Sequence, residues 1–382
     1  MKPAFLICLL FTVHCLPFVA LAKEGSLVTA SSGGKRLFRF DSKADFSAFT
    51  MTGAAWDHDE IVFEEGKGIA QGLVESPYVE TGFPFDQAVV SWNAITPPNS
   101  YLTVYIRVRS GGFWSRRFTV AIWNQDNRPV QRMSVNGQKD DIAEMDSDTL
   151  LLQKPGDAFQ VSAKLSSLDG ETYPALRLLT VDVVDSKSPA ARLRAHKSVW
   201  GTDIAVPERS QLTVTDGVRF CSATSTSMVL AYWAEKLNHP KLTVPLQTAV
   251  DGIYDKEWGG TGNWTFNTAY AGEFGGLKAY VTRLRGTADA EKWIAKGVPV
   301  IISIDYNVIR GRKGGRMGHL MVLRGFTENG DCIINDPYTK LDQGESVRKV
   351  FKRKDFERSW LSNVGSLGTV YLIYPTGWDI PD

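Results

Sequence analysis

A cysteine at the head of an apolar segment is the residue of this chain best suited to nucleophilic chemistry. Cys221 opens a stretch that we expect to be a helix, in which small residues recur at Ala223, Ser227 and Ala231 and apolar side chains cover most of the remaining surface. A helix that is apolar almost all round lies inside a domain. The free N–H groups of its first turn favour the thiolate form of a cysteine. The alternative is a buried structural thiol, a common environment for lone cysteines.

A thiol nucleophile needs a base that accepts its proton and a third group that orients the base. Of the five histidines, only His319 begins an apolar, strand-like stretch in the same half of the chain as Cys221. A histidine at the start of a strand is usually structural when it is considered alone. Its position relative to Cys221 makes His319 the candidate base.

A hairpin downstream of His319 supplies the candidate orienting group. Two apolar stretches flank Asn329-Gly330, which is a strong hairpin signal. If residues 327–330 form the loop, so that the residues on either side of it pair, Asp336 falls opposite Met321, on the face of His319 and within side-chain reach. A two-residue loop would keep that face but place Asp336 one step farther away. A loop of odd length would place Asp336 on the opposite face of the hairpin from His319.

A glutamine upstream of the cysteine is a candidate for stabilising negative charge. Gln211 lies ten residues before Cys221. Its side-chain amide could join the backbone N–H of Cys221 in an oxyanion hole. A glutamine in a loop carries no such meaning by itself.

The N-terminus has the pattern of a secretory signal. Lys2 gives a short basic start, residues 4–13 form an apolar run, and Ala20-Leu21-Ala22 is a small-x-small cleavage site. His14 and Pro17 interrupt the apolar stretch, which argues against a membrane anchor. We expect cleavage near Ala22 and a secreted protein, extracellular or periplasmic, without an integral membrane anchor.

Composition limits the other function classes. Removing residues 1–22 from the 382 leaves 360, enough for roughly two domains. The chain carries 43 basic and 42 acidic residues, a balance that gives no support for nucleic-acid binding.

Only Cys221 and Cys332 would remain after cleavage, so there is no disulfide framework. The two could pair with each other, but Cys332 lies in an apolar run and reads as a buried strand residue.

The two halves of the chain differ in pattern. Residues 101–109 alternate strictly between apolar and polar, and several further short strands are separated by turn clusters. This pattern predicts an all-β sandwich or jelly roll, followed by a region of mixed helices and strands. The expected order is a signal peptide at 1–22, a flexible segment at 23–36, the β-sandwich at 37–184, a linker at 185–203, an α+β domain at 204–376 and a C-terminal tail at 377–382.

The order Gln211, Cys221, His319 and Asp336 resembles the papain-like cysteine peptidases of the C39-like family, relatives of the double-glycine leader peptidases, over roughly residues 200–375. The matching stretches include Val206-Pro207, Cys221 to Leu230, Gly318 to Phe326 and Ile334-Asn335-Asp336-Pro337. Residues 91–98 resemble the β domain that often precedes the peptidase. One departure is Ser222-Ala223, where many relatives have Gly-Pro or Ser-Pro. A proline there only preorganises the first helical turn, so we expect lower rigidity rather than altered chemistry.

The resemblance implies a papain-like fold and a role for each of the four residues. Cys221 would be the nucleophile, His319 the general base and acid, Asp336 the orienting group and Gln211 an oxyanion donor. The implied protein is an exported cysteine peptidase or amidase that hydrolyses a peptide or amide bond through an acyl-enzyme. No cofactor is implied, and the scattered histidines offer no metal cluster.

Other functions remain open at this stage. An acyltransferase would use the same residues, with an amine in place of water. A catalytically inactive papain-like domain could instead bind a partner, together with a glycan- or protein-binding β domain. The substrate could be a peptide, a protein or a cell-wall cross-bridge. Trp92, Trp114 and Trp123 could form a sugar-stacking platform for cell-wall or glycan contact, although such tryptophans more often pack in a core.

Overall fold

The computed structural model describes most of the chain after the N-terminal region. The expected signal peptide at residues 1–22, its expected cleavage near Ala22 and residues 23–33 of the expected flexible segment lie outside this part of the chain. None of the helices within it is long and apolar enough to cross a membrane. The described ranges are 34–64, 70–128, 130–191, 193–313, 316–362 and 366–381.

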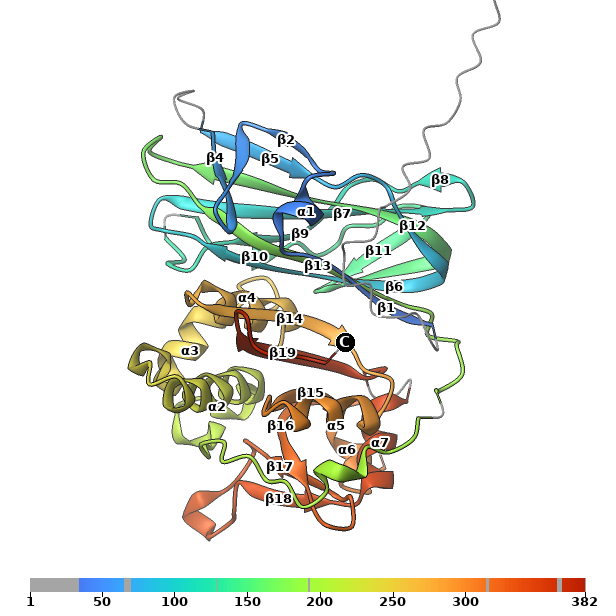
Figure 1. Ribbon diagram of the computed structural model, residues 1–382, viewed down its shortest axis with the longest axis vertical. Helices are drawn as coiled ribbons and strands as arrows, with labels where there is room; N and C mark the ends of the chain where they lie inside the picture. The colour runs from blue at the N-terminus through green and yellow to red at the C-terminus, as the bar shows by residue number, and fades with distance from the viewer. Residues whose placement is uncertain are drawn as a thin grey trace, which may run out of the picture.

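The N-terminal part of the described chain is an all-β domain, as its alternating pattern predicts (Figure 1). In it, 13 strands form one hydrogen-bonded antiparallel sheet, because the long strands β6 and β12 pair with different neighbours along their length. The strands are β1 (Lys35–Phe40), β2 (Thr50–Thr52), β3 (Ala54–Asp57), β4 (Glu60–Phe63), β5 (Gln71–Glu75), β6 (Val79–Ile95), β7 (Ser100–Ser110), β8 (Phe113–Trp114), β9 (Phe118–Trp123), β10 (Met133–Ser134), β11 (Ala143–Asp146), β12 (Thr149–Ser167) and β13 (Ala175–Val184), with the short helix α1 (Lys43–Phe46).

The alternation that predicted strand β7 has its expected cause. Leu102, Val104, Ile106 and Val108 are all buried on one face, whereas Tyr105 on the other face is partly exposed. Burial of every second side chain is what fixes the register of such a strand. The prediction of a strand over residues 101–109 is confirmed.

The three tryptophans do not form one sugar-stacking platform. Trp92 and Trp123 are fully buried and pack edge-on against Phe266, at ring-centroid distances of 6.2 and 5.2 Å. Only Trp114 remains partly exposed, and it stacks on Tyr78 at 4.6 Å. The platform is therefore wrong, because two of its members are needed to fill the core.

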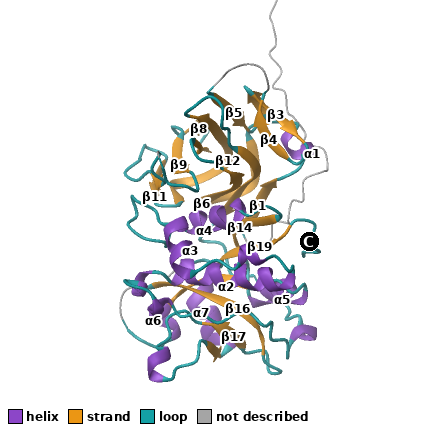
Figure 2. Ribbon diagram, turned by 90° about the vertical axis from the view of Figure 1, so that its left-hand side faces the viewer, coloured by secondary structure: helices purple, strands orange, loops and turns teal. Residues whose placement is uncertain are grey.

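The C-terminal part is an α+β region, in which helices gather around a second sheet (Figure 2). This sheet has six antiparallel strands in the order β14-β19-β15-β16-β17-β18. The strands are β14 (Leu277–Arg283), β15 (Val300–Asp305), β16 (Gly318–Phe326), β17 (Cys332–Asn335), β18 (Arg348–Phe351) and β19 (Thr369–Pro375). The helices are α2 (Cys221–Lys236), α3 (Leu246–Ile253), α4 (Trp264–Glu273), α5 (Thr287–Ala295), α6 (Tyr306–Ile309) and α7 (Arg353–Leu361).

Polar side chains of the first sheet cover the edge strand of the second. Strand β14 lies at the sheet edge, where backbone groups would otherwise lack partners. Asn93 of β6 bonds to both backbone groups of Ala279, at 2.7 and 2.9 Å. Ser91 accepts from Val281 N–H at 2.9 Å, and Asp182 of β13 accepts from the backbone and side chain of the edge strand's last residue. The first sheet thus substitutes for a missing strand.

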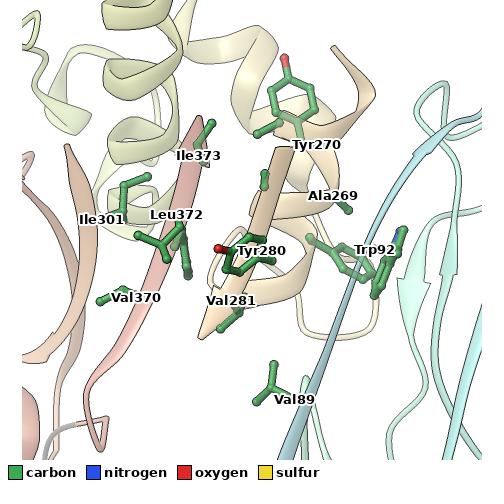
Figure 3. Close-up of a cluster of buried hydrophobic side chains, with 14 of the residues drawn as sticks. Val89, Trp92, Ala269, Tyr270, Tyr280, Val281, Ile301, Val370, Leu372 and Ile373 are labelled. Carbon is green, nitrogen blue, oxygen red and sulfur yellow. The ribbon is translucent and has the colours of Figure 1, made fainter. Parts of the chain in front are cut away.

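Apolar side chains complete this contact. Residues of both sheets belong to one continuous hydrophobic core. Figure 3 shows Val89 and Trp92 of the first sheet beside Ala269 and Val281 of the second region. At the end of α4, the buried Glu273 carboxylate accepts hydrogen bonds from the first sheet, including one from the Trp123 indole N–H at 2.7 Å. The β domain is therefore a fixed support for the region that carries Cys221.

Candidate active site

Cys221 is the first residue of α2, as the sequence predicts, and it is partly buried. Behind it the helix is buried from Ser222 to Ala234. Small side chains allow this close packing, and Ser225 Oγ donates to the carbonyl of Leu320 in β16 at 3.1 Å. Because the first N–H groups of a helix have no intrahelical acceptor, this helix end favours a negative charge on Cys221 Sγ.

His319 is the second residue of β16 and is almost fully buried. Its Nε2 lies 2.8 Å from Asp336 Oδ1. Nε2 contacts Asp336, so Nδ1 is the ring nitrogen left for the Cys221 thiol, and each of these two groups shifts the pKa of the other. The ring of Tyr306 packs on the imidazole at a centroid distance of 4.1 Å and an interplanar angle of 38°. The structure therefore brings Cys221, His319 and Asp336 together, with a hydrogen bond between His319 and Asp336.

The hairpin reaches this arrangement by an unexpected register. Phe326 pairs with Cys332 rather than with Asp331, so the connecting loop has an odd length, and the predicted pairing is wrong. A β-bulge further along β16 then shifts the register by one residue. The odd loop and the bulge cancel, and Asp336 stays on the side of His319.

The Asp336 carboxylate accepts four hydrogen bonds. Oδ1 accepts from His319 Nε2 and from the backbone N–H of Tyr338, at 2.8 and 3.0 Å. Oδ2 accepts from Tyr306 Oη and from Lys349 Nζ, both at 2.8 Å. An ionised carboxylate offers about four lone-pair sites, so every site has a donor. The carboxylate is held in one orientation.

The electrostatics favour charge separation between the thiol and the imidazole. Burial alone raises the pKa of Asp336, but His319 and Lys349 lower it to about 2. Burial alone lowers the pKa of His319, but Cys221 and Asp336 raise it to about 9. Burial raises the pKa of the Cys221 thiol, whereas the charge and hydrogen bond of His319 and two backbone N–H groups bring it below its ordinary value. The thiol and the imidazole therefore each favour the charged form of the other.

Gln211 is fully buried at the start of the 3-10 turn η2 (Gln211–Thr213). Its backbone N–H donates to the carbonyl of Pro337, the residue after Asp336, at 2.9 Å. Its side-chain Nε2 donates one hydrogen to the carbonyl of Gly217 at 2.7 Å. A Cβ at Gly217 would lie 1.8 Å from the Gln211 backbone oxygen, so only glycine fits this contact. An amide nitrogen has a second hydrogen, which remains for another acceptor.

Two contacts of Asp336 were not foreseen from the sequence. Tyr306 directly follows β15, and no sequence pattern assigned it a role. Because β15 lies antiparallel to β16, with Ile304 opposite His319, strand pairing could have suggested the contact. Lys349 lies on β18, a strand without a clear pattern in the sequence, and no signal pointed to it.

The two cysteines of the described ranges, Cys221 and Cys332, are both free, so the alternative of a disulfide between them is wrong. Cys332 is fully buried, and burial raises the pKa of its thiol. Within the described ranges, no three His, Cys, Asp or Glu side chains are grouped so that they could hold a metal ion. Cys221 is thus the thiol with the electrostatic environment of a nucleophile.

Comparison with known proteins assigns the chain to a family. The fold and the site define a protein in which an all-β domain supports an α+β region with a Cys–His–Asp cluster. Residues 36–183 match the family model described as "Peptidase C39 N-terminal domain", and residues 203–367 match the one described as "Peptidase_C39 like family". The chain belongs to the C39-like peptidase family, as the order of its sequence motifs predicts.

Similarity to individual proteins is low. No curated protein matches the chain. A crystal structure of a proposed C39-like peptidase from Bacillus anthracis has 20% sequence identity and a TM-score of 0.33, with 45% of this chain and 96% of that chain covered. The carbohydrate recognition domain of Emp46p has 10% identity and a TM-score of 0.23, with 37% and 91% covered. Neither likeness bears on the function.

Proposed function

We propose that this protein is an exported cysteine peptidase or amidase in which Cys221, His319 and Asp336 form the catalytic triad of a papain-like domain. The observation that carries the proposal is the position of His319, which hydrogen-bonds to Asp336 and is near enough to Cys221 for each to shift the pKa of the other. A buried cysteine kept only for packing has no need of a charged partner that lowers its pKa. Family membership supports the same reaction class.

The geometry suggests how the reaction would proceed. The Cys221 thiolate attacks the carbonyl carbon of a bound amide and forms a tetrahedral intermediate. The His319 imidazolium then gives its Nδ1 proton to the leaving nitrogen, and the C–N bond breaks to leave a thioester. His319 next removes a proton from water as the water oxygen attacks the thioester, and the collapse of this second intermediate breaks the C–S bond. It releases the acid and leaves the Cys221 thiolate and the His319 imidazolium, with which the cycle began. Asp336 holds Nε2–H throughout and stabilises the imidazolium.

Two donors are available for the negative oxygen of the intermediate. The backbone N–H of Cys221 lies at the first position of α2, where helices leave their N–H groups without intrahelical partners. The second is the remaining amide hydrogen of Gln211. Removal of one such donor typically costs about 10²–10³ in kcat. We therefore assign Gln211 the role of an oxyanion donor.

The reaction can be tested by peptide cleavage with a matched pair of cysteine variants. The mature protein would be incubated with a complex peptide library, and new termini would be identified by mass spectrometry. We expect cleavage by wild type and by Cys332→Ala, and none by Cys221→Ala. Addition of a primary amine separates hydrolysis from acyl transfer, because a transferase would form the new amide. Cleavage that persists in Cys221→Ala would exclude the triad.

A second candidate function is glycan contact through the β domain. Tyr78 and Trp114 stack on each other at the surface, and Phe113 beside them is 75% exposed. Exposed aromatic rings of this kind can stack on sugars. We expect Trp114→Ala to abolish retention of the protein on insoluble peptidoglycan without changing peptide cleavage. Equal retention of the wild type and the variant would rule this surface out.

A further inference from the structure

A basic cavity lies where the first sheet meets the second region. It has a volume of about 320 Å³ and is lined by residues of β1, β14, α5 and β19. Its only acidic lining residue is Asp289, and none of Cys221, His319 and Asp336 lines it. The basic residues that line it are Lys35, Arg36, Arg39, Arg283, Arg285 and Lys292.

Carboxylates neutralise only half of this positive charge. Lys35, Arg36 and Lys292 form no ion pair with any carboxylate of the described ranges. The whole chain has a formal net charge of only +1, so the excess is local. The pairs that do form are Arg39–Asp41, Arg283–Asp182 and Arg285–Asp289, at 3.3, 2.6 and 2.7 Å.

Several donors at the cavity are buried without an acceptor. Arg283 has a side chain that is only 1% exposed, and its Nε has no partner among the described residues. The same holds for Nε of Arg36, whose Nη1 donates to the Thr81 carbonyl at 3.0 Å. Buried donors are normally satisfied. Two guanidinium Nε atoms without a protein acceptor, on two residues that line one cavity, therefore favour an acceptor that binds there.

The ammonium of Lys35 shows the same shortage of negative charge. Its Nζ donates to the carbonyls of Leu284 and Leu367, at 3.1 and 2.6 Å. Burial and the charge of Arg283 lower the pKa of Lys35 to about 8, although Asp182 and Asp289 act in the opposite direction. A bound anion would offset both causes.

We propose that this cavity binds a multivalent oxyanion, either free phosphate or sulfate or such a group carried by a larger molecule. The three cations without a carboxylate partner supply enough positive charge for a divalent oxyanion, and guanidinium groups donate to its oxygens with favourable geometry. The volume is that of a small-molecule site. The bound anion would connect β1 of the first sheet to β14 and α5, at a place separate from the proposed catalytic residues.

Isothermal titration calorimetry of the full chain with inorganic phosphate tests the proposal. We expect one saturable site per chain and binding at least about tenfold weaker in Arg36→Ala and in Lys292→Ala, since each loses a charged partner. The control Lys241→Ala removes an exposed cation outside the cavity and should bind as wild type does. At equal ionic strength, acetate should bind far more weakly than phosphate.

The outcomes are decisive for both the site and its source. Absence of saturable binding, or equal binding by wild type and Lys292→Ala, would overturn the proposal. Lys292 is exposed, so its variant should fold normally, and Arg36→Lys is the conservative check if Arg36→Ala is unstable. If glycerol phosphate binds as tightly as phosphate, the natural ligand is a phosphate or sulfate group carried by a larger molecule. If it binds more weakly, the natural ligand is the free anion. Peptide cleavage by Lys292→Ala should be unchanged, which separates this site from the proposed function.

Discussion

Replacement of Asp336 by Asn tests whether the carboxylate charge supports the Cys221–His319 pair. The substitution keeps size and shape but removes the charge. The pKa of Asp336 is about 2, against an ordinary value of 3.8. That difference corresponds to about 2 kcal/mol of preference for the carboxylate, and the group is nearly fully buried. A neutral amide loses this interaction.

The hydrogen bonds around the carboxylate predict how the introduced amide would be oriented in Asp336→Asn. Four donors surround the two oxygens of Asp336, whereas an amide has a single oxygen. The Lys349 side chain is 29% exposed and can turn to water. The amide oxygen should therefore stay with His319 and Tyr338, so that the ring keeps its position and loses only the electrostatic support. Asp336→Asn is thus a test of charge rather than of geometry.

We expect the reactive pKa of Cys221 in Asp336→Asn to rise by about one unit or more, with cleavage near pH 6 reduced about ten- to a hundredfold. The free energy of unfolding should fall by about 2 kcal/mol at neutral pH. The measurements are the pH profile of kcat/KM and urea unfolding. Asp342→Asn, at an exposed position of the 3-10 turn Leu341–Gln343, is the control. A pH profile identical to that of wild type would refute the reasoning.

Three further predictions concern the site and the interface between the two parts of the chain. Tyr306→Phe keeps the ring on His319 but removes one hydrogen bond, and should lower the free energy of unfolding by about 1 kcal/mol in urea. Glu273→Ala leaves buried donors of the first sheet unsatisfied and should lower the free energy of unfolding by about 3 kcal/mol in the same assay. A decrease below about 1 kcal/mol would contradict a fixed interface between the two parts. The pKa of His319 is raised, so the stability that its protonated form contributes to the fold is lost as pH rises through about 9. The pKa of Cys221 is lowered, so the stability that its thiolate contributes is lost as pH falls through that lowered pKa. The destabilisation by His319→Gln should therefore be largest at about pH 7–8 and shrink at about pH 10.

The sequence was most informative where one local pattern dominates. The strict alternation of residues 101–109 predicted β7 because one face of that strand is buried. The small and apolar residues after Cys221 predicted α2 for a similar reason. In both cases the buried positions carry apolar or small residues, and their spacing along the sequence is that of the strand or helix.

The contacts of Asp336 show why the rest could not be predicted. An odd-length loop and a bulge that compensates for it are two backbone irregularities that no residue pattern reveals. Lys349 reaches Asp336 from β18, whose position depends on how the whole sheet is assembled. Such contacts depend on tertiary packing rather than on local sequence.

The interface between the two parts was also missed. For Trp92 and Trp123 the sequence left a sugar-stacking surface open beside the more usual core packing, because an aromatic side chain on a strand fits either face. Their burial follows from the presence of α4, which supplies Phe266 from far along the chain. The expectation of two domains joined by a linker did not foresee a shared core.

The central claim is that His319 activates Cys221, and the rate of Cys221 alkylation by iodoacetamide against pH tests it most directly. Peptide mapping would follow Cys221 and the buried Cys332 separately, with Cys332 as the internal control. An unperturbed thiol titrates at about pH 8.5. We predict rapid labelling of Cys221 in mildly acidic solution, and loss of this labelling in His319→Ala. Labelling that rises only above about pH 8 in wild type, or a profile unchanged by His319→Ala, would contradict the account.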